Sequence, residues 1–132
     1  EDIDEKKVWR SIELAELSKF VSSLPLKIDT IVGNRGIKLS GGQVQRIGIA
    51  RVLYRKSKVL VLDEATSSLD IETEKAIVKS LESIGDKMTL IVVTHRLETL
   101  KNFKKIYVIK DGSFAGHGTY KEIIENKNIY KH

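Results

Sequence analysis

The segment from residue 58 to residue 64 constrains the fold of this chain more than any other. Four consecutive apolar residues, Val59–Leu62, lead directly into Asp63 and Glu64. An apolar run of this length, without polar alternation, is typical of a strand that is buried on both faces in a parallel sheet. Because a helical pattern and a second apolar run follow it, the sequence predicts an α/β fold.

The rest of the chain divides into elements by periodicity and by helix breakers. Asp4 is suited to cap a helix over about 5–22, and Pro25, the only proline, ends that segment. Ser40 begins a second helix that extends to about residue 56. The later expected elements are a helix over 71–84, a strand over 88–94, a short helix over 96–102, a hairpin with strands over 105–110 and 113–118, and a last helix from 119 or 120 toward His132.

The composition narrows the classes of function. The 132 residues are one domain's worth, and 41% of them are hydrophobic, which is enough for a core. The net charge of +5 permits an anionic partner, but the lysines are scattered and no aromatic residues interleave with them, so we expect no nucleic acid. The chain has no cysteine, no zinc-like ligand spacing and no apolar run long enough to span a bilayer.

Residues 39–43, Leu-Ser-Gly-Gly-Gln, open the second predicted helix. Unpaired backbone N–H groups and the positive end of the helix dipole favour an anion at such a position. Gly41 and Gly42 let the backbone approach a phosphate closely, because no Cβ intervenes. The Ser40 hydroxyl and the Gln43 amide supply further polar contacts. Taken alone, the same residues are also compatible with a serine-capped helix after a glycine-rich turn.

Asp63 and Glu64 end the apolar strand with two adjacent carboxylates. Acids at the carboxyl edge of a parallel sheet often mark a ligand crevice. Asp63 suits Mg²⁺, which takes one or two carboxylates and otherwise keeps waters and phosphate oxygens. Glu64 is placed to orient or deprotonate a water for attack on a γ-phosphate. The alternative without a ligand is that both acids are solvated turn residues or helix caps.

His95 follows the second predicted strand at the same carboxyl edge. A histidine there can donate a hydrogen bond to a γ-phosphate, although a lone histidine is also compatible with a structural role. His117 and His132 have no such context, and we assign them no role.

In their order and spacing, residues 39–43 and 59–64 closely resemble the signature and Walker B motifs of ABC-type ATPases. Residues 67–70 resemble the D-loop of that family, and His95 resembles its switch histidine. Residues 30–36 look like the X-loop of exporter-type members, which communicates with transmembrane coupling helices. The resemblance covers essentially the whole chain.

This resemblance implies part of a P-loop NTPase domain. Residues 1–45 would belong to the helical subdomain, and 46–132 to the C-terminal part of the ATPase core. No Gly-x-x-x-x-Gly-Lys-Ser/Thr phosphate loop occurs in the chain. By analogy, the phosphate-loop strand of the family would lie between the strands at 88–94 and 105–110. We therefore expect the chain on its own neither to bind ATP tightly nor to hydrolyse it.

The resemblance also implies an ATP- and Mg²⁺-dependent exporter at the cytoplasmic face of a membrane. Its partners would be transmembrane domains and a second nucleotide-binding domain, alike or different, arranged head to tail. Across that dimer, residues 39–43 would contact ATP held by the partner, and Asp70 would lie at the seam. Asp63 would hold Mg²⁺ through water, Glu64 would act on the attacking water, and His95 would contact the γ-phosphate. The alternatives are an ABC-type ATPase of DNA repair or chromosome maintenance, and a regulatory module that does not hydrolyse ATP.

Overall fold

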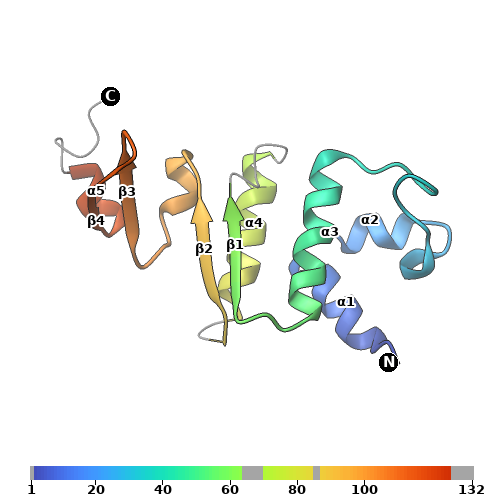
Figure 1. Cartoon of the computed structure of the whole chain (residues 1–132). Helices are drawn as coiled ribbons and strands as arrows, with labels where there is room; N and C mark the ends of the chain where they lie inside the picture. The colour runs from blue at the N-terminus through green and yellow to red at the C-terminus, as the bar shows by residue number, and fades with distance from the viewer. Residues whose placement is uncertain (1, 64–69, 85–86, 126–132) are drawn as a thin grey trace. The chain divides into compact units, whose positions relative to one another are not determined.

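The computed structural model describes residues 2–63, 70–84 and 87–125. The chain forms two compact units, Glu1–Thr94 and His95–His132, each with its own internal packing. The expected fold class is confirmed. A helical segment leads into a parallel β-α-β unit, and an antiparallel hairpin follows in the second unit (Figure 1). No helix in the described ranges has the length and apolar character needed to cross a membrane.

The single helix predicted over residues 5–22 is wrong, because the structure has two helices there, α1 (Glu5–Leu14) and α2 (Ser18–Ser23). Asp4 caps α1 as expected, and its Oδ1 accepts a hydrogen bond from the N–H of Lys7 at 3.1 Å. The chain then leaves the helix at Glu16, whose φ is +54°. A left-handed residue at this position is the usual way to end a helix, and it overrides an apolar pattern that continues beyond it.

Two hydrogen bonds define this helix end as a Schellman motif. The N–H of Glu16 donates to the carbonyl of Glu13 at 2.9 Å, and the N–H of Leu17 donates to the carbonyl of Ile12 at 3.0 Å. The side chains of Ile12 and Leu17 are both buried in the hydrophobic core of the first unit. The end of the helix therefore places Leu17 in the core. In a continuous helix, Leu17 would instead occupy the position set by the helical repeat.

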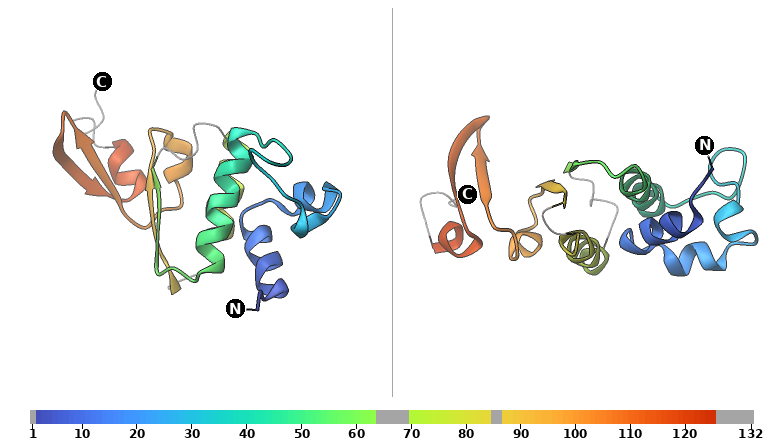
Figure 2. Two further views of the ribbon diagram at one scale, coloured as in Figure 1. Left: turned by 45° about the vertical axis from the view of Figure 1, so that its right-hand side comes forward. Right: turned by 90° about the horizontal axis from the view of Figure 1, so that it is seen from below.

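The β-α-β unit consists of β1 (Val59–Asp63), α4 (Ile71–Glu82) and β2 (Thr89–Val93). The two strands pair in parallel, with Val61 opposite Ile91 and Asp63 opposite Val93. The helix α4 lies against one face of this pair, as Figures 1 and 2 show from different directions. Ile77 and Leu81 of α4 join Leu60 and Leu62 in the core.

The prediction that β1 is buried on both faces is wrong, and β2 is likewise exposed on one face. Leu60 and Leu62 are buried, whereas Val59, Val61, Ile91 and Val93 are between 47% and 55% exposed. Successive side chains of a strand point to opposite faces, so coverage by α4 protects one set only. Within the described ranges, the second apolar face has no element packed on it that would bury it.

The helix α3 (Gly41–Tyr54) packs against α1 and contributes Ile49 and Ala50 to the core. Between α2 and α3 the chain forms a short 3₁₀ turn, η1 (Lys27–Asp29), and an isolated bridge between Val32 and Ile37. These segments connect the helical part of the first unit to residues 39–43.

The second unit contains η3 (Leu97–Leu100), β3 (Ile106–Lys110), β4 (Ser113–Gly118) and α5 (Tyr120–Glu125). The strands β3 and β4 form the expected hairpin, and positive φ values at Asp111 (+51°) and Gly112 (+73°) give its turn the handedness that hairpins favour. Ile106 and Ile123 are buried in this unit. The predicted continuation of the last helix toward His132 falls in residues 126–132, outside the described ranges.

The helix break gives a testable prediction about stability. Leu17 is only 1% exposed, so Leu17→Ala should remove core contacts and lower the free energy of unfolding by about 2–5 kcal/mol. Leu26→Ala is the matched control, because Leu26 is 65% exposed and its truncation should change stability by less than about 0.5 kcal/mol. Chemical unfolding of the protein measures both. Equal effects would contradict the placement of Leu17 in the core.

Candidate functional site

The first turn of α3 is fixed by a reciprocal capping box. Ser40 is the N-cap, and its Oγ accepts a hydrogen bond from the N–H of Gln43 at 3.2 Å. The side-chain Oε1 of Gln43 in turn accepts from the N–H of Ser40 at 2.8 Å. Two of the predicted site residues therefore hold each other in place, which orders the helix start without any ligand.

The capping box leaves several hydrogen-bond donors available at the same place. The N–H groups of Gly41 and Gly42 lie in the first turn, which has no earlier helical carbonyl to accept from them, and neither takes part in a hydrogen bond among the described residues. The Ser40 O–H and the Gln43 side-chain NH₂ are donors that the box does not use. No acidic residue occurs in this turn. The donor set and the helix dipole together fit a phosphate group.

The remaining residue of the predicted pentad, Leu39, is half-buried just before the cap, whereas Ser40 and Gly41 are exposed. Gly42 is buried, and its carbonyl accepts a hydrogen bond from Nε of Arg46 at 3.2 Å. The pentad thus combines an exposed helix start at Ser40 and Gly41 with a buried glycine at position 42.

Asp63 is the last residue of β1 and is exposed at its carboxyl end. No group of three or more His, Cys, Asp or Glu side chains that could hold a metal occurs among the described residues. The carboxylate of Asp63 is of the kind that Mg²⁺ takes alongside water and phosphate oxygens. Glu64, the predicted catalytic base, lies outside the described residues.

The N-terminal end of α3 and the carboxyl end of β1 lie at the same end of the first unit (Figure 1). The chain reverses direction between Tyr54 and Val59, so the helix and the strand run in opposite directions. A 14-residue helix is about 21 Å long and a five-residue strand is about 17 Å long. Because these lengths are similar, residues 40–43 and Asp63 reach a similar level along the unit.

Asp70 caps α4, and its carboxylate is engaged by one neighbour. Its Oδ1 accepts from the N–H of Thr73 at 2.9 Å, and its Oδ2 accepts from the Thr73 hydroxyl at 2.7 Å. These hydrogen bonds, from the backbone first and the side chain second, hold the pKa of Asp70 below its ordinary value. The structure thus shows a local capping role for Asp70; its predicted place at a dimer seam stays a prediction.

His95 is exposed at a bend between β2 and η3, and it is the first residue of the second compact unit. The structure thus brings residues 40–43 and Asp63 to one end of the first unit, while the role of His95 stays a prediction.

The contact between Arg46 and Glu16 was missed by the sequence reasoning. Nη1 of Arg46 donates to the main-chain carbonyl of Glu16 at 2.7 Å, in addition to the Nε bond to Gly42. The four-residue spacing of Gly42 and Arg46 signals only the local half of this arrangement. The other half joins residues 30 positions apart, and nothing in the sequence indicates it.

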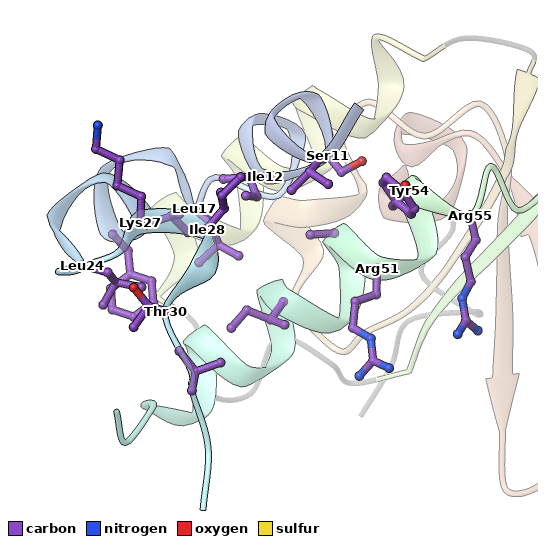
Figure 3. A pocket seen from close by; sticks show the side chains of 16 residues that line it. Ser11, Ile12, Leu17, Leu24, Lys27, Ile28, Thr30, Arg51, Tyr54 and Arg55 are labelled. Carbon is purple, nitrogen blue, oxygen red and sulfur yellow. The ribbon is translucent and has the colours of Figure 1, made fainter. Parts of the chain in front are cut away.

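A second feature missed by sequence is an apolar cavity of about 500 Å³ between α1, α2, η1 and α3 (Figure 3). Its wall includes Ile12, Leu17 and Ile28, and Arg51 and Arg55 lie at its edge. Figure 3 shows the guanidinium groups of these arginines extending from the same side of α3. The cavity is lined by residues other than the pentad 39–43, so we place the candidate chemistry at the helix start and not here.

A helix start with free donors and a parallel strand that ends in an acid are typical of α/β nucleotide-binding proteins. The family model described as "ABC transporter" matches residues 2–67, half of the chain. The chain therefore belongs to the ABC transporter family.

Curated relatives match the chain over nearly its full length. It is 42% identical over 130 residues to an ATP-dependent lipid A-core flippase of Cupriavidus pinatubonensis, covering 98% of this chain and 22% of the relative. It is 41% identical over 129 residues to a multidrug resistance ABC transporter ATP-binding and permease protein of Lactococcus lactis, again covering 98% and 22%. The chain thus spans about a fifth of the length of these relatives.

A solved structure of a bacterial Atm1-family ABC exporter with ATP bound matches the fold with a TM-score of 0.86 and 33% sequence identity. The match covers 98% of this chain and 23% of that one. The arrangement of helices and strands described above is therefore that of a portion of an ABC exporter.

The cap of α4 gives a prediction about pH. Thr73→Val removes the hydroxyl donor and keeps the backbone donor, so the pKa of Asp70 should rise toward its ordinary value. In the unchanged protein the lowered pKa contributes stability that is present above the unfolded-state pKa and is lost as the pH falls through the folded-state pKa. NMR titration of the Asp70 carboxyl carbon measures the shift. Thr119→Val is the control and should leave Asp70 unchanged, because Thr119 caps α5 instead.

Proposed function

We propose that this chain is part of the nucleotide-binding domain of an ABC-type membrane exporter that uses ATP hydrolysis to energise translocation. The observation that carries the proposal is the first turn of α3, where four donors remain unused and no acid is present. The exporters among the relatives and the solved structures support the choice of exporter over other ABC ATPases.

In this proposal the two ends of the site serve two different nucleotides. Ser40, Gly42 and Gln43, with the neighbouring Leu39 and Gly41, contact ATP held by a second nucleotide-binding domain. Asp63 supports Mg²⁺ through a water molecule at the nucleotide of its own domain. Their location at the same end of the first unit, on separate elements, supports this division.

The remaining roles rest on the same division. Glu64, directly after Asp63, positions and deprotonates the attacking water. His95 donates a hydrogen bond to the γ-phosphate, and Asp70 lies near the dimer seam while it caps α4. We propose a functional boundary near residue 45, with the helical subdomain before it and the ATPase core after it.

The proposed partners are transmembrane domains and a second nucleotide-binding domain in head-to-tail arrangement, at the cytoplasmic face of the membrane. The cofactors are ATP and Mg²⁺. A phosphate loop contributed from outside residues 1–132 completes each site, since the chain contains none.

A pair of substitutions at Ser40 tests the proposal in the intact transporter. Asp and Asn are N-caps as good as Ser, so Ser40→Asp and Ser40→Asn should both preserve α3. Ser40→Asp places a negative charge where the partner's phosphates bind, and we expect ATP turnover to fall by about 100-fold or more. Ser40→Asn, which is neutral, should retain considerably more activity. Equal turnover in the two variants, with equal melting temperatures, would contradict an anion site at this turn.

A substitution at Glu64 tests the hydrolytic role separately. Glu64→Gln keeps the shape of the side chain and removes its basicity, so ATP turnover in the intact protein should fall by about 100-fold or more while ATP binding persists. Steady-state phosphate release and equilibrium nucleotide binding measure the two quantities. Turnover at the unchanged rate would require a different catalytic base.

A further inference from the structure

Glu16 joins three helices through two separate hydrogen bonds. Its main-chain carbonyl accepts from Nη1 of Arg46, on α3, at 2.7 Å. Its carboxylate Oε1 accepts from the hydroxyl of Ser80, on α4, at 2.9 Å. The residue itself ends α1, which packs against both α3 and α4. One residue in a turn thus contacts partners 30 and 64 positions away along the chain.

The backbone conformation of Glu16 is one that glutamate seldom adopts, so the presence of glutamate at this position needs a reason. A φ of +54° is uncommon outside glycine, and glycine or asparagine is the usual residue at this position of a helix end. Lys56 ends α3 with the same φ of +54° and the corresponding hydrogen bond to Leu53. The side chain of Lys56 has no hydrogen bond or ion pair in the described part of the chain. Glu16 differs because its carboxylate reaches another helix.

The hydrogen bond from Arg46 connects Glu16 to the start of α3, at residues 39–43. Arg46 bridges the carbonyl of Glu16 and the carbonyl of Gly42, one turn earlier in its own helix. Since Gly42 belongs to the phosphate-facing first turn, the position of that turn relative to α1 depends on this guanidinium. A planar guanidinium with several fixed donors is suited to holding two carbonyls at once.

The hydrogen bond to Ser80 links Glu16 to α4, the helix that follows β1 in the chain. Ser80 lies in the third turn of α4, whose first residue follows the Asp70 cap. Residues 64–69 connect β1 to that cap, so α4 and Asp63 belong to one β-α-β unit. Glu16 therefore connects the element that would contact the partner's ATP with the unit that would act on the domain's own ATP.

We infer that Glu16 is a positioning residue for ATP hydrolysis, which sets the placement of the signature turn relative to the β-α-β unit through Arg46 and Ser80. The inference rests on the proposed function. Glu16 contacts neither nucleotide, and it acts through the two helices that it joins. Loss of its carboxylate would then lower the rate of turnover, kcat, with little change in the KM for ATP, because the main-chain bond to Arg46, which supports the ATP-contacting turn, is kept.

Glu16→Gly in the intact transporter separates this role from helix termination. Glycine is favoured at φ +54°, so the end of α1 and the melting temperature should be preserved or improved. The variant keeps the carbonyl that binds Arg46 and loses the bond to Ser80. Because this hydrogen bond lies at the surface, its loss should lower kcat by about two- to tenfold. The KM for ATP should stay within about twofold.

Three companion variants make the result specific. Lys56→Gly, the matched control at the same backbone conformation, should leave kcat unchanged. Glu16→Gln should retain most of kcat, because its amide oxygen can still accept from Ser80. Ser80→Ala should reproduce the loss seen in Glu16→Gly, and combining the two should add little, as expected for two sides of one contact.

The outcomes separate this inference from the proposed function. Wild-type turnover that Glu64→Gln abolishes, together with an unaffected Glu16→Gly variant, would overturn the role of Glu16 and leave the ATPase assignment intact. Glu16→Gln as damaging as Glu16→Gly would also overturn it. If the wild-type protein showed no turnover, the proposed function would fail. Hydrogen exchange then tests the link alone, because the amides of residues 76–82 should exchange faster in Glu16→Gly than in Lys56→Gly. Equal exchange in both would overturn the link.

Discussion

The left-handed backbone of Glu16 is the constraint on which the helical half of the first unit depends. It ends α1 and allows the N–H of Leu17 to reach the carbonyl of Ile12 at 3.0 Å, which places Leu17 in the core. In this conformation the Glu16 carbonyl accepts a hydrogen bond from Arg46, and its carboxylate accepts one from Ser80. A longer helix would have satisfied the local pattern but would have lost the core contact and both links.

The reversal of the chain between α3 and β1 has an equally large effect on the site. A helix donates from its N-terminal end, and a parallel sheet binds ligands at the carboxyl ends of its strands. Only opposite directions bring these two ends to one surface, and the similar lengths of α3 and β1 bring them to a similar level (Figure 1). The proposed function uses this surface for two nucleotides, one held by the partner domain and one by the chain's own domain.

The sequence predicts well those features of this chain that depend on residues close together in the sequence. It misses features that depend on contacts between distant residues. The caps at Asp4, Ser40 and Asp70 are set by side chains that reach a backbone N–H three residues away, and the predicted helices start at or directly after these residues. The exposure of the second face of β1 and β2 was missed. Burial depends on which elements cover a strand, and an apolar run in the sequence does not show which elements these are. The bond from Arg46 to Glu16 was missed for the same reason.

The capping box at Ser40 explains how the pentad can be ordered and still receptive. A phosphate site made of mobile donors loses affinity to the ordering of those donors on binding, and a preformed one avoids that loss. Here Ser40 and Gln43 satisfy each other through one acceptor atom apiece, at 3.2 and 2.8 Å, while the hydroxyl proton, the NH₂ group and the Gly41 and Gly42 amides stay unused. Alanine at either position would break the box and remove a donor together, so replacement by another N-cap residue separates helix stability from phosphate recognition.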